Sequence, residues 1–336
     1  MKVYKKIARR TIFPLAMKMG VDTFFRNRAK NSILNVMYHG VASSDSCYFS
    51  PRHISEKQFE EHLRYYAENF EIISLNEAFE MLESKEPLEK KYITVSFDDG
   101  FKNNLITALP ILEKYKIPVT FFVSSVCIEN EENNYLWAET IAALNYFYRD
   151  QPIEVDNKIF KNLICEEEDL VLSNFIKSLP YNRRDTVLIS LEEKYDLRKK
   201  MKSLPEELWR LLNKEELIEL SKSEIVTIGS HGHRHFNLAE IGIEEAKNEL
   251  LTSKELLSKS LNVNIDLVAY PDGSYNDEVK DIAEKLGYKG QLAVNYRSQE
   301  DRVDPRIMNR HGISSCTTFD SNMLFLNMAF KKKGLY

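Results

Sequence analysis

The chain has 336 residues, of which 43% are hydrophobic, enough for one large α/β domain or two ordinary ones. Its formal net charge of −5 argues against a general nucleic-acid-binding protein, so no nucleic-acid partner is expected. The four cysteines lie far apart without a Cys-x-x-Cys pair, which indicates neither a disulfide framework nor a thiolate zinc site.

Residues 1–30 form a basic amphipathic N-terminal segment. They contain nine Lys or Arg against one acidic residue, Asp22, and apolar side chains recur at helical spacing over residues 2–19. Such a segment either rests on an anionic lipid surface or packs on its own domain, and both interpretations stay open. No apolar run approaches the roughly 20 residues of a spanning helix, and no secretory signal is recognisable. We therefore expect a cytoplasmic protein, with peripheral contact at the inner membrane face as the alternative.

Residues 31–336 alternate expected strands with expected helices. The β-branched and aromatic runs predict strands over 33–38, 71–74, 92–96, 118–123, 225–229, 266–270, 291–294 and 307–313. Apolar periodicity and capping residues predict helices over 55–69, 76–82, 103–115, 243–261, 277–286 and 319–330. Strand, helix and strand at this spacing indicate parallel βαβ units. The segment from about residue 129 to residue 222 interrupts this alternation. It is rich in Glu, Lys, Leu and Asn, which predicts a helical insertion.

Two adjacent carboxylates, Asp98 and Asp99, follow the expected strand 92–96, and Gly100 permits a sharp exit from it. Adjacent aspartates that are buried together would repel each other. A metal ion separates their roles, because it takes one as a ligand and leaves the other free as a base. An ordinary Asp-Asp-Gly turn is the simpler interpretation of these residues alone.

Three of the seven histidines stand within five residues after the expected strand 225–229. His231 and His235 are four residues apart, and a helical or tight-turn backbone would place both imidazoles on one side. This arrangement suits a metal with nitrogen ligands at about 2.1 Å. Two His and one Asp leave coordination positions open for water and substrate, as catalytic metal sites do. A surface histidine turn is the alternative, and His233 is a further imidazole that could compete for the metal.

Three segments resemble, in this order, the motifs of the polysaccharide deacetylase family, carbohydrate esterase family 4, which has the NodB-homology fold. They are residues 96–100 (SFDDG), 230–235 (SHGHRH) and 270–273 (YPDG). The resemblance runs from about residue 35 to residue 313, apart from the insertion. It implies an α/β fold, a deformed (β/α) barrel of seven or eight strands with active residues at the C-terminal ends of the strands.

The resemblance also implies roles for individual residues. Asp98 corresponds to the catalytic base of the family. Asp99, His231 and His235 correspond to the ligands of a divalent metal, usually zinc.

The chain departs from the family pattern beside these residues. Gly232 stands where Ser or Thr is common. Ala269 stands where many members have an Arg that orients the base, so another residue must do this here, and Arg310 is our candidate.

The general acid has two candidates. Many family members supply a late histidine, and His311 lies in a late expected strand. The poly-N-acetylglucosamine deacetylase branch instead resembles this chain at an early Tyr-His pair, Tyr38-His39. We favour His39 and keep His311 as the alternative.

The function implied is hydrolysis of an N-acyl group, N-acetyl in the family, on an amino sugar of a glycan. The metal would polarise the amide carbonyl, Asp98 would deprotonate the attacking water, and His39 would protonate the departing amine. Two alternatives stay open. The basic N-terminal segment would suit a deformylase or deacetylase of a lipid-linked sugar, and a non-catalytic glycan-binding relative would share the fold.

Overall fold

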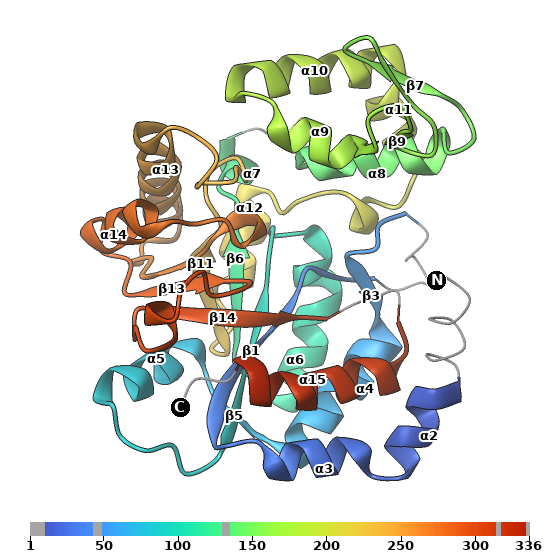
Figure 1. The fold of residues 1–336 in the computed structure, drawn as a ribbon. Coiled ribbons are helices and arrows are strands. Elements are labelled where there is room, and N and C mark those ends of the chain that lie inside the picture. The colour runs from blue at the N-terminus through green and yellow to red at the C-terminus, as the bar shows by residue number, and fades with distance from the viewer. Residues whose placement is uncertain (1–10, 43–48, 130–134, 314–316, 334–336) are drawn as a thin grey trace.

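The computed structural model describes residues 11–42, 49–129, 135–313 and 317–333. Their centre is a closed barrel of seven parallel strands, which confirms the predicted α/β barrel (Figure 1). The barrel strands, in chain order, are β1 (Ser32–Tyr38), β5 (Lys91–Phe97), β6 (Val119–Val123), β11 (Val226–Ser230), β12 (Leu267–Ala269), β13 (Gly290–Ala293) and β14 (Ile307–Gly312).

The strands follow the order β1-β14-β13-β12-β11-β6-β5, and pairing of β1 with β5 closes the ring. An eighth strand, β4 (Glu71–Ile72), lies outside the ring and pairs with the beginning of β5. On the same edge of β5, the later residues of that strand pair with β6. The short strands β2 (Gly40–Ala42) and β3 (His53–Ser55) pair with each other just beyond β1. Every residue of β1 is buried, as expected for a parallel strand that is covered on both faces.

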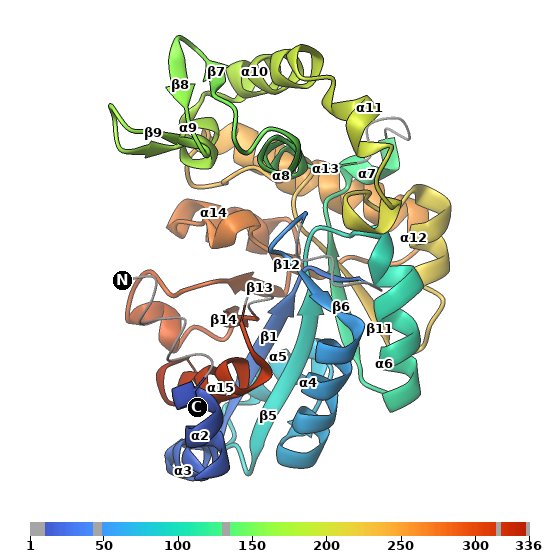
Figure 2. The same cartoon turned by 90° about the vertical axis from the view of Figure 1, so that its right-hand side faces the viewer.

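Helices surround the barrel in positions close to those predicted (Figure 2). They are α4 (Glu56–Asn69), α5 (Leu75–Ser84), α6 (Leu109–Tyr115), α12 (Lys214–Leu220), α13 (Ile243–Leu261), α14 (Asp277–Lys285) and α15 (Phe319–Lys333). Three short helical turns are η3 (Asn104–Ala108), η6 (Pro271–Gly273) and η7 (Glu300–Arg302). The helix expected over 103–115 begins as the π-helical turn η3, in which the Leu109 N–H reaches back to the Asn104 carbonyl. Pro110 follows and has no N–H with which to continue an α-helical ladder at that point.

The N-terminal segment contributes α2 (Phe13–Lys18) and α3 (Val21–Arg28), which lie beside α15 in Figure 1. Phe13 contacts Phe325 of α15 edge to face, with ring centroids 5.4 Å apart. Residues 2–10 of the expected amphipathic run lie outside the described part of the chain. None of the described helices has the length and apolarity that crossing a bilayer requires.

The interruption of the barrel forms a separate layer above the C-terminal ends of the strands (Figures 1 and 2). We call residues 135–209 the insertion. Its helices are α8 (Trp137–Phe147), α9 (Leu172–Ser178), α10 (Tyr181–Lys194), α11 (Leu197–Met201) and the short η5 (Glu206–Leu208), and α7 (Val126–Glu129) precedes it. Two hairpins, which the sequence did not predict, are β7 (Ile153–Val155) with β8 (Lys158–Phe160) and β9 (Ile164–Cys165) with β10 (Leu170–Val171).

The insertion has a hydrophobic core of its own, which includes Leu144, Phe160 and Leu172 and is distinct from the barrel core. The side chains of Leu217 and Leu220 on α12 belong to the barrel core instead. The insertion therefore packs as a second unit over the barrel.

Candidate metal centre and active site

Asp98 and Asp99 leave the end of β5 in a tight turn. The Asp98 N–H donates to the Tyr38 carbonyl at 3.0 Å, so the pairing of β1 with β5 determines where this turn begins. Asp99 has φ 73° and Gly100 has φ 85°. A Cβ on Gly100 would meet Val123 Cγ1 at 3.0 Å, so glycine suits both the conformation and the close approach. Both carboxylates are buried, because Asp98 is 2% exposed and Asp99 is 1% exposed.

His231 follows β11, and its ring is oriented by the backbone of β12. Its Nδ1 lies 2.7 Å from the Ala269 carbonyl oxygen. A carbonyl can only accept, so Nδ1 carries the proton and Nε2 presents its lone pair to the barrel end. The next residue, Gly232, has φ 72°, a conformation that Ser or Thr would adopt only with strain. This explains why glycine occupies the position at which the chain departs from the family pattern.

Glu249 on α13 shapes the loop that carries the second histidine. Its buried carboxylate accepts the His233 N–H at 3.0 Å and the Arg234 N–H at 2.8 Å. The loop is not helical, and His235 itself has φ 58°. The positive φ turns the chain so that His235 Nε2 lies 3.3 Å from Asp99 Oδ1.

Asp99, His231 and His235 converge. Asp99 Oδ1 lies 3.6 Å from His231 Nε2 and 3.3 Å from His235 Nε2, and one ligand atom from each residue lies within 4.8 Å of the others. A tetrahedral zinc with bonds of about 2.1 Å holds its ligand atoms about 3.4 Å apart, so the spacing fits. Asp99 Oδ1 is also buried and accepts no hydrogen bond, which is the condition of a carboxylate oxygen that a cation would satisfy. These three residues fit a divalent cation.

The pKa values of Asp99, His231 and His235 follow from their burial and from the charges of their neighbours. Burial lowers the pKa of His231 to about 4, so this ligand is neutral at pH 7. Burial lowers the pKa of His235 as well, but the adjoining Asp99 carboxylate outweighs burial and leaves the pKa raised. Burial raises the pKa of Asp99, yet His235, His39 and Arg52 together hold it well below its usual value. Asp99 is therefore an anion at neutral pH.

Arg310, on β14, holds the second carboxylate. Its Nη1 donates to Asp98 Oδ1 at 2.5 Å, and Arg310 is 1% exposed. The other oxygen, Asp98 Oδ2, faces His231 Nε2 at 3.6 Å. Burial raises the pKa of Asp98, but Arg310 and His231 outweigh it and the pKa is lowered. The Arg310 guanidinium is thus in contact with the proposed base. It takes the place of the arginine that many family members have at the position of Ala269.

The three other histidines that the sequence analysis named differ in where they lie. His39 lines the same cavity as both aspartates and is near enough for them to oppose the lowering of its pKa by burial. His311 is not among the residues that line this cavity, and it follows Arg310 on a strand whose side chains alternate in direction. His233 Nε2 lies 3.3 Å from Glu129, so its ring is turned away from the Asp99 group.

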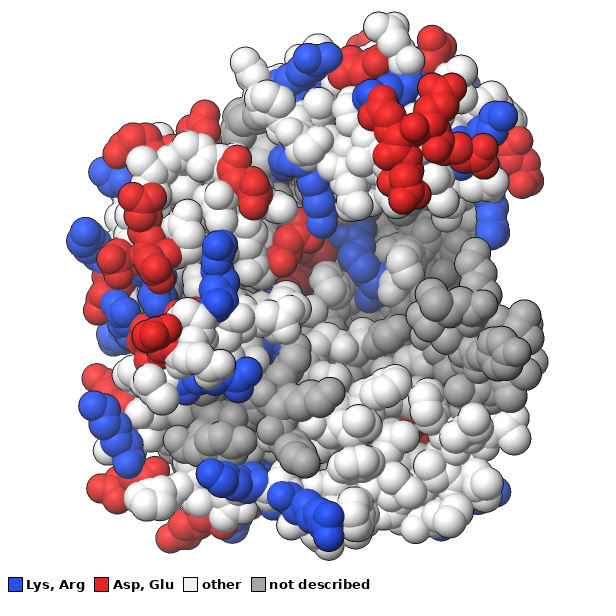
Figure 3. All heavy atoms as spheres, in the orientation of Figure 1, with Lys and Arg blue, Asp and Glu red and all other residues white. Residues whose placement is uncertain are grey.

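A cavity of about 660 Å³ opens over these groups. Figure 3 shows a hollow between the insertion and the barrel, with acidic and basic side chains at its centre. Its floor comes from the barrel ends. Its opposite wall comes from the insertion, through Trp137, Ala138, Ile141, Ala142, Asn145, Leu163, Ser173 and Lys177.

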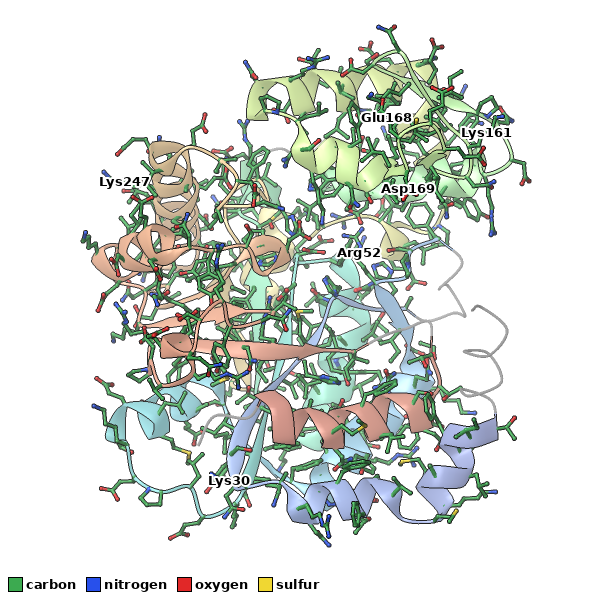
Figure 4. All side chains as sticks on the ribbon, viewed as in Figure 1. Lys30, Arg52, Lys161, Glu168, Asp169 and Lys247 are labelled. Atoms are coloured by element: carbon green, nitrogen blue, oxygen red, sulfur yellow. The ribbon has the colours of Figure 1, made fainter. Side chains whose placement is uncertain are left out.

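Three charged residues at this site carried no sequence signal. Arg52 lies between the barrel and the insertion (Figure 4), with Nη1 3.2 Å from Asp99 Oδ2 and Nη2 bonded to the Glu139 carboxylate. Lys177 on α9 forms an ion pair of 2.8 Å with Asp272. Each contact joins segments that are far apart in the sequence, so no local spacing could have indicated it.

The fold and site together define a class: a parallel barrel with an Asp-His-His cation site and a second buried carboxylate beside it, at the C-terminal ends of the strands. Comparison identifies the group within that class. The polysaccharide deacetylase family model matches residues 85–291, and the chain belongs to this family.

Relatives agree with this assignment. The protein named "Putative polysaccharide deacetylase YxkH" from Bacillus subtilis (strain 168) is 20% identical over 255 residues, which span 76% of this chain and 61% of YxkH. The structure of the Streptococcus pyogenes deacetylase PplD in complex with acetate has a TM-score of 0.55 at 20% identity, covering 89% of this chain and 99% of PplD. IcaB from Ammonifex degensii has a TM-score of 0.57 at 16% identity, covering 90% and 99%. At these identities the two structures support the fold alone.

Proposed function

We propose that this protein is a metal-dependent hydrolase that removes an N-acetyl group from an amino sugar of a glycan. The observation that carries the proposal is the buried Asp98 carboxylate beside the Asp99, His231 and His235 group, in one cavity at the barrel end. Membership of the polysaccharide deacetylase family supports the substrate class. The acetate in the PplD structure is the acid that such a reaction would release.

The residues have separate roles in this proposal. A divalent cation, most simply zinc, bound by Asp99, His231 and His235 would act as a Lewis acid on the amide carbonyl and lower the pKa of a water. Asp98, kept ionised by Arg310, accepts the proton of the attacking water. His39 donates a proton to the amine nitrogen as the C–N bond breaks, and the proton that Asp98 has taken up replaces it on His39. Water and amide thereby become a carboxylic acid and an amine.

The early Tyr38-His39 pair favours substrates of the poly-N-acetylglucosamine type. Tyr38 and His39 point to opposite sides of the end of β1. The Tyr38 hydroxyl lies 2.7 Å from the Tyr66 hydroxyl in the core, whereas His39 lines the cavity. This placement supports His39 over His311 as the acid.

A lipid-linked amino sugar is the second candidate substrate, because the N-terminal helices expose apolar side chains beside basic ones. Ile12, Leu15 and Met19 are 56%, 58% and 73% exposed, and Lys18 and Arg28 are exposed near them in the sequence. Peripheral contact with an anionic membrane surface at the inner face belongs to this candidate. Sedimentation with vesicles of phosphatidylglycerol and phosphatidylcholine, with and without residues 1–30, tests it, and a wild type that stays in the supernatant contradicts it.

Acetate release from a panel of N-acetylated glycans and lipid-linked sugars tests the main proposal. Asp98→Asn should lower turnover by about 10²–10⁴-fold and still bind zinc. His231→Ala should lose both turnover and zinc binding. His233→Ala is the matched control, because its ring faces Glu129, and it should behave as wild type. Wild-type turnover by the Asp98 variant would refute the role given to this carboxylate. Glycan binding without acetate release by a zinc-loaded wild type would indicate a non-catalytic relative.

A further inference from the structure

Arg52 joins the cation site to the insertion. Its Nη1 lies 3.2 Å from Asp99 Oδ2, and its Nη2 donates to Glu139 Oε1. The side chains of Asp99 and Glu139 are 1% and 0% exposed, so one guanidinium contacts two buried carboxylates. The planar fork of an arginine permits this, because its donors diverge toward different acceptors.

Glu139 carries the connection to the cavity wall. Its second oxygen, Oε2, accepts the Leu136 N–H at 3.1 Å and so closes the first turn of α8. Trp137 and Ile141 of the same helix line the cavity opposite the aspartates. Successive hydrogen bonds thus run from a proposed cation ligand to the helix that forms the wall.

Arg52 also restricts Asp99. The two oxygens of Asp99 are divided, since Oδ1 faces His231 and His235 and Oδ2 faces Arg52. A carboxylate turns readily about its terminal torsion, so a partner for one oxygen keeps the other directed at the imidazoles. Ser50 Oγ lies 3.4 Å from Arg52 Nε and helps to hold the guanidinium.

We propose that Arg52 is a positioning residue that raises the affinity of the cation site and couples its occupation to the order of α8. The inference rests on the proposed function only in taking Asp99 as a cation ligand. Coupling of this kind is reciprocal, so a change at Glu139 must alter cation binding although Glu139 does not belong to the Asp99 group. A residue that merely neutralised buried charge would leave the order of α8 independent of cation binding.

Zinc affinity of the full chain, measured by competition with a chromophoric chelator, tests the proposal. Arg52→Met should weaken zinc binding by about 10–100-fold, the usual effect of removing a hydrogen bond to a metal ligand. Glu139→Gln should weaken it as well. The double variant should be no weaker than Arg52→Met, because Glu139 acts only through Arg52. Losses that multiply in the double variant, or wild-type affinity in Arg52→Met, would overturn the proposal.

Arg183→Met is the matched control. Arg183 pairs with Asp156 at 2.7 Å on the outer side of the insertion, so the same substitution there should leave zinc affinity unchanged. Arg52→Met leaves Glu139 buried without its cation and could fail to fold. The double variant removes both charges, and if Arg52→Met does not fold, a double variant with wild-type affinity overturns the proposal.

Hydrogen exchange of α8 supplies a second readout. Zinc should slow amide exchange over residues 137–147 in the wild type and should fail to do so in Arg52→Met. If the wild type binds zinc but the amide exchange of α8 stays equally fast, the proposed coupling is overturned. A wild type that binds no zinc would instead refute the cation site itself, so the two failures are distinguishable.

Discussion

The barrel and the insertion contribute different parts of this site. Every group with a proposed role in the chemistry, from His39 and Asp98 to His231 and Arg310, belongs to the barrel. The insertion supplies the facing wall and packs around a separate core. The two units meet through polar bridges such as Arg52 with Glu139 and Lys177 with Asp272. The reacting groups can therefore stay fixed while the surface that receives the substrate is built by another unit.

Removal of the Arg310 guanidinium from the barrel should have the largest effect. Arg310→Met leaves Asp98 without its 2.5 Å partner in a buried site, so we expect a loss of about 3–5 kcal/mol of unfolding free energy. Because Arg310 lowers the pKa of Asp98, its loss should raise that pKa and move the acidic limb of the pH–rate profile to higher pH. Chemical unfolding and the profile measure both effects. An unmoved acidic limb would contradict the link between Arg310 and the base.

A matched pair of core substitutions tests whether the two units unfold separately. Phe121→Ala in β6 and Phe160→Ala in β8 each remove a side chain that is 0% exposed, and each should cost about 3–5 kcal/mol. Since the cores are distinct, Phe160→Ala should open cleavage sites within residues 135–209 and spare the barrel. Phe121→Ala should expose the barrel. Limited proteolysis with mass spectrometry distinguishes these patterns, and identical cleavage maps would show a single cooperative unit.

The pH dependence of zinc binding should come from the barrel alone. A protonated imidazole cannot bind a metal, so zinc affinity should fall about tenfold per pH unit below the raised pKa of His235. His231, with its pKa of about 4, should add a second proton only in more acidic solution. Chelator competition across a pH series measures this slope. Phe160→Ala should show the same slope of zinc affinity against pH. A different slope would mean that groups in the insertion also take up protons in competition with zinc.

The exposed bridge between the units should matter least. Lys177 and Asp272 are 32% and 29% exposed, so solvent screens their attraction and Lys177→Met should cost less than about 1 kcal/mol. Because Lys177 lines the cavity, KM should rise by a few-fold at most while kcat is kept. A large fall in kcat would mean that Lys177 takes part in the reaction and that the division between the units is incomplete.

Most barrel elements were predictable because local pattern determines them. The buried strands read as continuous apolar runs, and the predicted helix 243–261 matches α13 at both ends. Asp98, Asp99, His231 and His235 were predictable as a group because the C-terminal ends of parallel strands meet at one edge of a barrel. Their proximity is now established, whereas their roles in catalysis stay predictions.

The insertion and its bridges were less predictable. Strands of two or three residues, such as β9 and β8, are too short to show alternation, and the hairpins were therefore missed. Arg52 and Glu139 stand 87 positions apart and belong to no motif, so only the folded chain brings them together. The direction of His233 likewise depends on the backbone of its loop, which residue spacing alone does not specify.

The position of β14 has a consequence for biosynthesis. This strand is the last of the barrel to leave the ribosome, yet it lies between β1 and β13 and carries Arg310 to a carboxylate 212 residues earlier. A nascent or truncated polypeptide that lacks it retains all three motif segments but has a gap in the ring and no guanidinium beside Asp98. The proposed hydrolytic activity should thus arise only after residues 307–312 have left the ribosome.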